Sequence, residues 1–409
     1  RDRDVTGVQT CALPIFDDGY IDYSKKMLDE RRIHRLFDAK RVVCVTDHAV
    51  VYTTPQMVER GAAIRRAVRD WGVENFYDVG AGGNAHILSL EAGLVSPGTF
   101  LFANDSHTSN NGAIGAMGMR TGTEIVTVLA TGTLWTEVPF SIRVTLSGRL
   151  QMGVYARDLG YRMARDFTNG NYGAEWDYRV LEFAGPALDH LSLAQRVAIC
   201  NTVTEIGVTN VFFPPNDAIL AYAKERAQRP FTPVYSDADA AYEAEIKIDL
   251  DKLGPQVVLP GAPDRATELG EAVGRKVDHA FIGSCGSGMY DDLLVTAKIL
   301  QGRKVAPGTR LFIVPGTVAS AKRIVDDGLM KIFQDAGAIV LPSGCGPCTK
   351  GTMAPLASGE VSICTAATNS AGRMGAKDAE IYLASPATVA CSAVNGKISD
   401  PRRFGVSLN

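Results

Sequence analysis

The sequence has no long apolar run, little net charge and few cysteines, and each absence excludes a class of protein. No stretch approaches the roughly 18 apolar residues of a membrane-spanning helix. The 409 residues carry a formal net charge of −3 and their basic side chains are scattered, so we expect neither a nucleic-acid nor a membrane partner. With 46% hydrophobic and 21% charged residues, the composition is typical of a globular chain of two or three domains.

Cysteine is too sparse for a disulfide framework, with eight copies in the whole chain. Cys44 in RVVCVTD and Cys200 in VAICNTV stand inside apolar runs, as do Cys364 and Cys391. A cysteine in such a run is usually a buried free thiol. Because no secretory signal is legible either, we expect a reducing compartment, the cytoplasm.

The first 15 residues, RDRDVTGVQTCALPI, have neither helical nor strand periodicity and join abruptly to FDDGYIDYSKKMLDE. We expect residues 1–15 to be a non-native or unstructured segment and leave Cys11 out of the chemistry. A short natural N-terminal arm is the alternative.

Apolar segments that end at glycine, proline or cysteine alternate with helical patterns. Residues 277–285, 309–316 and 337–345 read as buried strands, and residues 291–302 and 320–337 as helices between them. This alternation predicts an α/β fold with a mainly parallel sheet. In such sheets the functional loops follow the carboxyl ends of the strands.

The most linker-like stretch is 226–256, where proline mixes with acidic residues. We therefore place a domain boundary near residue 245. After the first segment, the expected α/β units are residues 16–140, 141–245 and 246–409.

Cys345 and Cys348, in SGCGPCTKG, form the strongest local motif. The intervening Gly-Pro favours a tight turn that brings two thiolates together for a metal, a cluster or a reversible disulfide. A thiol oxidoreductase shares the CGPC spelling, but the TKGTMAPLASGE that follows is a poor start for a helix. Cys285, in FIGSCGSGMY, is the natural third thiolate. Three thiolates suit a [4Fe–4S] cluster with one iron free of protein ligands, whereas zinc needs four ligands or three and a water.

Histidines beside carboxylates follow predicted strands. Asp47-His48 comes after RVVCVT, Asp105 and His107 come after GTFLFAN, and His86 lies in GAGGNAHILSLEAG. A neighbouring carboxylate fixes the histidine tautomer and makes the ring a proton donor near neutral pH. One such pair is more often a surface hydrogen bond, but two pairs at strand ends beside glycines indicate a site.

Five blocks together resemble the aconitase and 3-isopropylmalate dehydratase large-subunit family. They are NDSHTSNNGAIGAMG, EFAGPALDHLSLAQRVAICNTVTEIG, VDHAFIGSC with DDLLVTAKIL, SGCGPCTKG, and EIYLASPATVACSAVNGKISDPR, in the family's order from about residue 40 to 403. The resemblance implies three α/β/α subdomains around a central iron–sulfur cluster site, without a swivel domain. It also implies Cys285, Cys345 and Cys348 as the cluster ligands.

The resemblance further implies a set of site residues. The catalytic ones are Asp47, His48, His86, Asp105, His107 and Glu205, and the substrate-binding ones are Ser106 and Arg373. The open iron would act as a Lewis acid on the substrate hydroxyl, and the histidine–aspartate pairs would hand protons to that hydroxyl and to iron-bound water. Glu205 would accept from or orient that water. Arg373 would clamp a carboxylate, with a structural bridge as its alternative role.

The sequence departs from the family at three places. The usual Cys-Thr-Asn is here Cys-Gly-Ser at 285–287, and the usual Asn-Arg-Asn-Phe is here Ala-Thr-Asn-Ser at 367–370. Thr368 thus replaces an arginine, which weakens dicarboxylate binding or signals a different substrate. The family's first strand and its early polar site residue are also expected to be missing, displaced by residues 1–15.

We therefore expect the large subunit of a [4Fe–4S] hydro-lyase that dehydrates and rehydrates a hydroxy di- or tricarboxylate. The leading substrate is 3-isopropylmalate, as in leucine biosynthesis; homocitrate or homoaconitate and a methyl-substituted malate are the alternatives. The chain would need a small swivel-domain subunit, as a heterodimer or heterotetramer. Two rival classes remain: a cluster-bearing binding or regulatory protein without turnover, and a thiol oxidoreductase.

Overall fold

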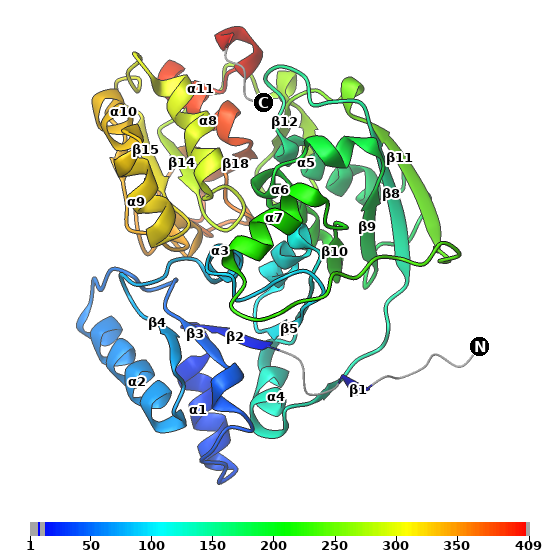
Figure 1. The fold of residues 1–409 in the computed structure, drawn as a ribbon. Coiled ribbons are helices and arrows are strands. Elements are labelled where there is room, and N and C mark those ends of the chain that lie inside the picture. Colours follow the sequence, from blue (N-terminus) through cyan, green and yellow to red (C-terminus); the bar gives the residue numbers. More distant parts are fainter. Residues whose placement is uncertain (1–6, 9–12, 406–409) are drawn as a thin grey trace.

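The structure is a computed structural model that describes residues 7–8 and 13–405. Its first unit is a five-stranded parallel sheet of order β4-β3-β2-β5-β6 (Figure 1). The strands are β2 (Leu13–Asp17), β3 (Val43–Val45), β4 (Asn75–Tyr77), β5 (Phe100–Ala103) and β6 (Met117–Arg120). The helices are α1 (Ile21–Glu30), α2 (Pro55–Trp71), α3 (Ala85–Glu91) and α4 (Ile125–Thr131). A two-residue pair, β1 (Gly7–Val8) with β7 (Leu134–Trp135), lies beside this unit.

The second unit is a four-stranded parallel sheet of order β10-β9-β8-β11. Its strands are β8 (Ser141–Ser147), β9 (Val180–Ala184), β10 (Asn210–Phe212) and β11 (Ala244–Asp249), and its helices are α5 (Ala156–Thr168), α6 (Leu193–Val203) and α7 (Asp217–Arg226). Along β8, buried residues alternate with exposed or half-buried ones. The sheet is therefore covered more fully on one face than on the other.

The third unit is a seven-stranded sheet of order β13-β12-β18-β17-β14-β15-β16. Its strands are β12 (Gln256–Val258), β13 (Ala266–Glu268), β14 (His279–Gly283), β15 (Arg310–Val314), β16 (Ile339–Val340), β17 (Val361–Cys364) and β18 (Glu380–Ala384), with α8 (Tyr290–Leu300), α9 (Val318–Asp326), α10 (Leu329–Ala336) and α11 (Pro386–Asn395). The strands from β18 to β16 are parallel, and β12 runs antiparallel to both neighbours. The predicted α/β class with mainly parallel sheets is confirmed.

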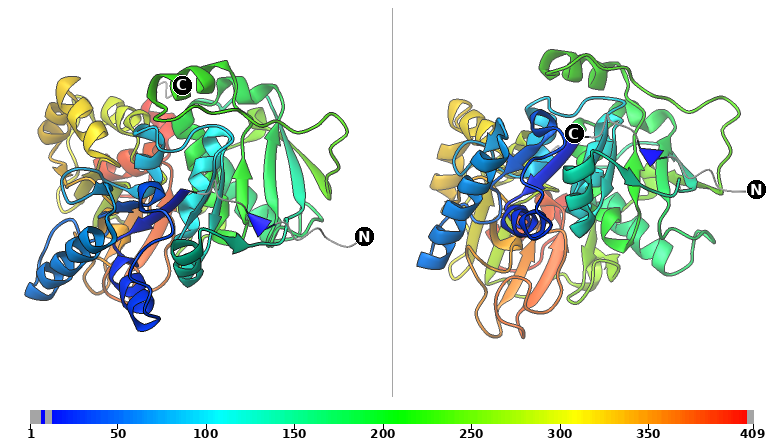
Figure 2. Two further views of the ribbon diagram at one scale, coloured as in Figure 1. Left: turned by 60° about the horizontal axis from the view of Figure 1, so that its bottom comes forward. Right: turned by 90° about the horizontal axis from the view of Figure 1, so that it is seen from below.

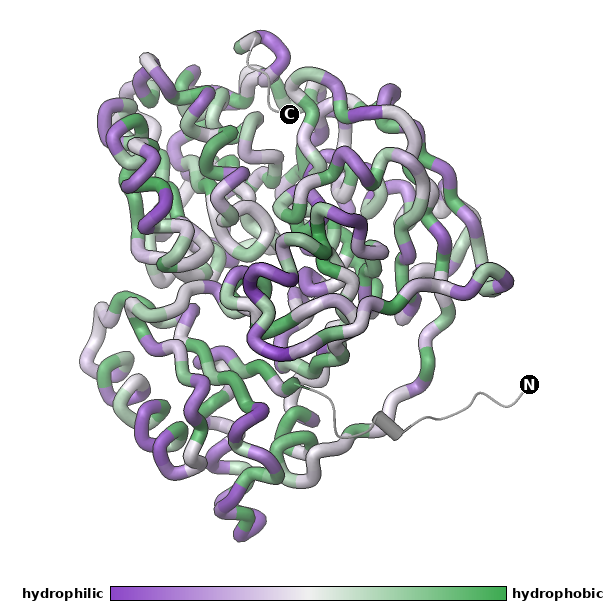
Figure 3. Tube along the Cα trace, viewed as in Figure 1, coloured by the Kyte–Doolittle hydropathy of each residue, from purple (hydrophilic) through white to green (hydrophobic). Residues whose placement is uncertain are grey.

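Local signals explain where the helices begin and end. α2 follows the N-cap Thr54 with proline at its first position and ends at Gly72 in the left-handed region. Its buried side chains, among them Ile64 and Val68, face inward, and Figure 3 shows the mixture of hydrophilic and hydrophobic residues along this outer helix. The segment at 320–337, expected as one helix, is two, because Gly328 takes a φ of 76° between α9 and α10.

The structure corrects the expectation for the start of the chain. Leu13, Pro14 and Ile15 belong to β2, which lies in the middle of the first sheet and supplies the first strand that we expected to be missing. Pro14 lacks the N–H that the interior of a strand usually donates, so the segment did not read as a strand in the sequence. Most of the remaining 1–15 prediction concerns residues 1–6 and 9–12, which include Cys11 and lie outside the described residues. The other two residues form the strand β1.

The sheets also bear on the predicted domain limits. β11 spans 244–249 and pairs with β8 in register along its length, so the second sheet continues past residue 245, where we placed a boundary. The sheet changes only between β11 and β12. The strand β2 runs across the predicted limit at 15/16, and the limit at 140/141 stays a prediction.

The three units meet around one centre (Figures 1 and 2). One hydrophobic core contains strand residues of both the first and the second sheet, such as Val43 and Val144. α3, α6 and the 3-10 helix η2 (Ser106–Ile114) pack where the units join. In the described part of the chain, no helix combines the length and the apolarity that crossing a membrane requires.

Candidate active site

The three predicted cluster cysteines lie at the carboxyl end of the third sheet. Cys285 follows β14, while Cys345 and Cys348 follow β16, where Cys345 precedes the 3-10 turn η8 (Gly346–Cys348) and Cys348 ends it. Cys285 and Cys348 are buried and Cys345 is half-buried. Residue Ser284 has a φ of 69°, so the chain turns sharply just before the first cysteine.

Each of these sulfur atoms faces a side-chain N–H group. Nδ2 of Asn201 lies 3.0 Å from the Sγ of Cys285, and Nδ2 of Asn84 lies 3.0 Å from the Sγ of Cys345. A weaker contact of 3.9 Å joins Nη2 of Arg373 to the third sulfur, that of Cys348. Hydrogen-bond donors stabilise a thiolate, which is the form that binds metal.

The charges around the thiols also fit a bound cationic group. Burial opposes ionisation of Cys285, but His107 and His86 outweigh it and lower its pKa to about 7. The pKa of Cys345 is raised well above its ordinary value by burial, and then by Asp47 and the two other cysteines. Such mutual repulsion is relieved when iron holds the three sulfurs, so the residues present fit a metal cluster.

Asp47 and His48 lie beside this thiol group. Nδ1 of His48 is 2.6 Å from Oδ1 of Asp47, and the backbone of Asp47 accepts the N–H of Cys345 at 2.9 Å. Asp47, His48 and Cys345 bring potential metal-ligand atoms within 4.8 Å of one another. The pKa of His48 is raised well above its ordinary value because Asp47 and Asp18 outweigh the effect of burial.

Asp17 and Asp18 are site residues that sequence reasoning missed. The carboxylate of Asp18 accepts the backbone N–H groups of Asp47, His48 and Ala49 at 3.2, 2.9 and 3.0 Å. Burial raises the pKa of Asp17 to about 6. The available signal was the acidic pair after the apolar PIF, whose first two residues fell in the segment 1–15 that we set aside.

A second group of polar side chains surrounds His107 and comes from three elements, α3, η2 and η5. Oδ1 of Asp105 lies 3.2 Å from Nε2 of His86 and 3.0 Å from Nδ1 of His107. The other nitrogen of His107, Nε2, is 2.6 Å from Oε1 of Glu205, which comes from the 3-10 helix η5 (Thr204–Ile206). Burial disfavours the charged ring, but Cys285 and Asp105 raise the pKa of His107 well above its usual value. The structure thus brings His86, Asp105, His107 and Glu205 together.

Arg373 lies near Cys348, Glu205 and Asp105, and it forms no ion pair with a carboxylate among the described residues. Within the same part of the chain its Nε is buried and has no hydrogen-bond partner. Cys348, Glu205 and Asp105 raise its pKa despite burial. An orphaned N–H of a guanidinium next to this group is suited to a bound anion and does not favour the structural-bridge alternative.

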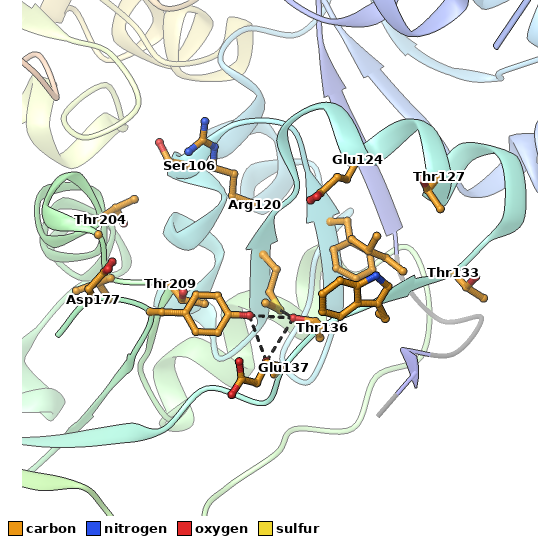
Figure 4. Close-up of a pocket in the computed structure, with 17 residues that line it drawn as sticks. Ser106, Arg120, Glu124, Thr127, Thr133, Thr136, Glu137, Asp177, Thr204 and Thr209 are labelled. Carbon is orange, nitrogen blue, oxygen red and sulfur yellow. Dashed lines mark hydrogen bonds between the residues drawn. The ribbon is translucent and has the colours of Figure 1, made fainter. Parts of the chain in front are cut away.

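A cavity of about 1510 Å³ opens on the side of Ser106 and Thr204, and neither the histidines, the cysteines nor Arg373 line it. Ser106 and Thr204, the neighbours of His107 and Glu205, line it, as Figure 4 shows. Arg120 lines the same wall beside Ser106 (Figure 4). Ser106 is therefore accessible from this cavity.

Fold and site together define an α/β protein in which three sheets converge on free thiols, histidine–carboxylate groups and an arginine whose Nε has no hydrogen-bond partner among the described residues. The chain belongs to the aconitase family, because the model of that family (aconitate hydratase) matches residues 34–275 and 271–396. The predicted family is thus confirmed, while the roles of single site residues stay predictions.

Curated relatives agree with this assignment. The 3-isopropylmalate dehydratase large subunit 1 of Methanopyrus kandleri is 39% identical over 379 residues, 92% of this chain and 89% of the relative. The probable methanogen homoaconitase large subunit of Methanosarcina mazei is 38% identical over 380 residues, 92% and 94% of the two chains. The crystal structure of Thermococcus kodakaraensis aconitase X, in its holo form, has a TM-score of 0.54 at 12% identity and covers 87% of this chain and 83% of that one, which shows likeness of fold alone.

Proposed function

We propose that this chain is the large subunit of a [4Fe–4S]-dependent hydro-lyase that removes water from a hydroxy di- or tricarboxylate and adds it back. The observation that carries the proposal is the set of three thiols, each facing an N–H donor, beside the His107 network and the orphaned Nε of Arg373. Cys285, Cys345 and Cys348 would hold the cluster, which supplies Lewis-acid chemistry at an iron without a protein ligand.

The protein residues then bind the substrate and manage its protons. Arg373 binds a substrate carboxylate, for which its planar fork is suited. His107, held between Asp105 and Glu205, stays protonated because both ring nitrogens face carboxylates. Its Nε2 proton can pass to Glu205 and from that carboxyl to the leaving hydroxyl. His48, held by Asp47, is placed for a second proton transfer. Ser106 contacts the substrate from the cavity wall.

We propose 3-isopropylmalate as the substrate, because it is the compound in the names of the dehydratase relatives. Homoaconitate-type acids are the second candidate, because the homoaconitase relative is as similar as the dehydratases. The chain would act with a small swivel-domain subunit, in keeping with the words "large subunit" in the names of these relatives.

Anaerobic reconstitution tests the proposal. The chain is loaded with iron and sulfide, mixed with a cognate small subunit, and assayed with 3-isopropylmalate, homoaconitate and a methyl-substituted malate. We expect visible cluster absorption and hydration or dehydration of one of these acids. A cluster without activity on any hydroxy acid would favour a binding or regulatory protein, and reduction of insulin disulfides without iron would favour a thiol oxidoreductase.

A further inference from the structure

Arg157 is a buried charged residue next to the first cluster cysteine, and the proposed chemistry does not use it. It lies on α5 and is fully buried. Its guanidinium donates to the Tyr161 hydroxyl at 2.7 Å, to the Ala366 carbonyl at 2.8 Å and to Oδ1 of Asn201 at 3.2 Å. Three acceptors on three sides hold the planar group in one position.

The contact with Asn201 determines how that amide is oriented. A guanidinium donates only, so the amide oxygen must face Arg157. The amide nitrogen is therefore turned the other way, and it lies 3.0 Å from the Sγ of Cys285. Asn201 is also fully buried, on α6, and α5 packs closely against α6. The packing of the two helices thus places Arg157 where it orients the amide of Asn201, and this amide donates an N–H···S hydrogen bond to Cys285.

Gly286, one of the departures from the family pattern, makes room for this arrangement. A Cβ at this position would overlap with Nη1 of Arg157 and with Oδ1 of Asn201, and it would lie 2.7 Å from Cγ of Asn201. The φ of Gly286 is not positive, so the backbone conformation does not require glycine. The space beside Cys285 requires it, and the threonine usual in the family would displace both side chains.

We infer that Arg157 is a positioning residue which, in the space left by Gly286, locks the N–H of Asn201 onto Cys285 and so sets the iron retention and reduction potential of the cluster. The inference rests on the proposed function for the presence of the cluster. Hydrogen bonds to cluster sulfurs shift the reduction potential, and partners of metal ligands control metal affinity.

A double-mutant cycle tests the inference on the reconstituted full chain. The variants are Gly286→Ala, Arg157→Lys, their combination, and the matched control Gly270→Ala, at a glycine with no atom within 4 Å of an added Cβ. The readouts are the rate of iron loss to a chelator and the midpoint potential. We expect Gly286→Ala to lose iron about tenfold faster and to have a more negative potential. The control should match the wild type.

The cycle also separates the arginine from the glycine. Lysine keeps the charge but lacks the rigid fork, so in the Arg157→Lys background the added alanine should have little further effect. Equal effects of alanine in both backgrounds, or wild-type potential and iron retention in Gly286→Ala, would overturn the inference.

A further variant covers the case in which Gly286→Ala does not fold. Asn201→Leu keeps nearly the same shape and removes the N–H donor without adding a charge beside the cluster, so it must also lower the potential. An unchanged potential in this variant would contradict the inference. A wild-type chain that takes up no cluster would contradict the proposed function instead.

Discussion

Oε1 of Glu205 lies 2.6 Å from Nε2 of His107, although the two residues are 98 positions apart in the sequence. The opposite nitrogen of the same ring faces Asp105 at 3.0 Å. The imidazole therefore lies between two carboxylates, which favours its protonated form. This relationship makes His107 the strongest proton donor candidate of the site.

Replacing Glu205 by glutamine should lower kcat by about 100-fold or more, with a smaller effect on KM. Glutamine keeps the shape but removes the carboxylate that receives the Nε2–H of His107. Steady-state kinetics of the complex with its small subunit measure the effect. Glu182→Gln is the control, because Glu182 also accepts hydrogen bonds, from Ser236 at 2.6 Å and Tyr242 at 2.8 Å, but on the second sheet. Equal kinetics in both variants would remove Glu205 from the mechanism.

Serine at position 285, 345 or 348 should abolish the cluster, because an alcohol is a far poorer iron ligand than a thiolate. Iron content and visible absorption after reconstitution report the loss. Cys391→Ser serves as the matched control, since Cys391 is a fully buried thiol of α11. Iron content that stays at the wild-type level in the Cys285→Ser variant would contradict the ligand assignment.

The Asp18→Asn substitution should destabilise the chain and lower its activity. The carboxylate accepts three backbone N–H groups from the loop that carries His48, and an amide cannot accept all of them equally well. We expect a loss of about 1–3 kcal/mol in the free energy of unfolding. Urea denaturation measures this, with Asp38→Asn at a half-exposed helix cap as the control. A loss no greater than that of the control would show that Asp18 does not hold this loop.

His279 should make the stability depend on pH. It is fully buried on β14, and burial, with the charge of Arg310, lowers its pKa to about 4. Between that value and the ordinary 6.5 the unfolded chain binds a proton that the folded chain does not. Its contribution to stability is thus present above pH 6.5 and lost as the pH falls to about 4, by about 3 kcal/mol.

Urea unfolding of the wild type and of His279→Gln between pH 4 and 7 measures this contribution as a difference. The difference is needed because buried Asp158, with a pKa of about 7, acts in the opposite sense. Its folded pKa is raised above 3.8, so its contribution is present at low pH and lost as the pH rises. A pH profile that is parallel in both proteins would contradict the role of His279.

Much of the site was readable because its residues occur in short motifs. Cys345 and Cys348 are three positions apart, and Asp105 and His107 are two apart, so local turns alone bring each pair together. Cys285 was also found, because cysteine after a buried strand is a local pattern. Asp18 was not found, because Pro14 kept the segment before it from reading as a strand. The N–H groups that Asp18 accepts also follow a different strand, β3.

By itself the sequence determined the fold class, through its alternating strands and helices, and the chemical groups available, through cysteine and histidine–aspartate motifs. Only the tertiary structure decided which distant groups meet. Asp17 is paired in register with Val45 in the parallel sheet, and this pairing places Asp18 under the backbone of His48. Likewise, the packing of α5 on α6 aims Asn201 at Cys285, and Glu205, on η5 directly after α6, reaches His107. Strand register and helix packing are long-range properties, and no local spacing in the sequence specifies them.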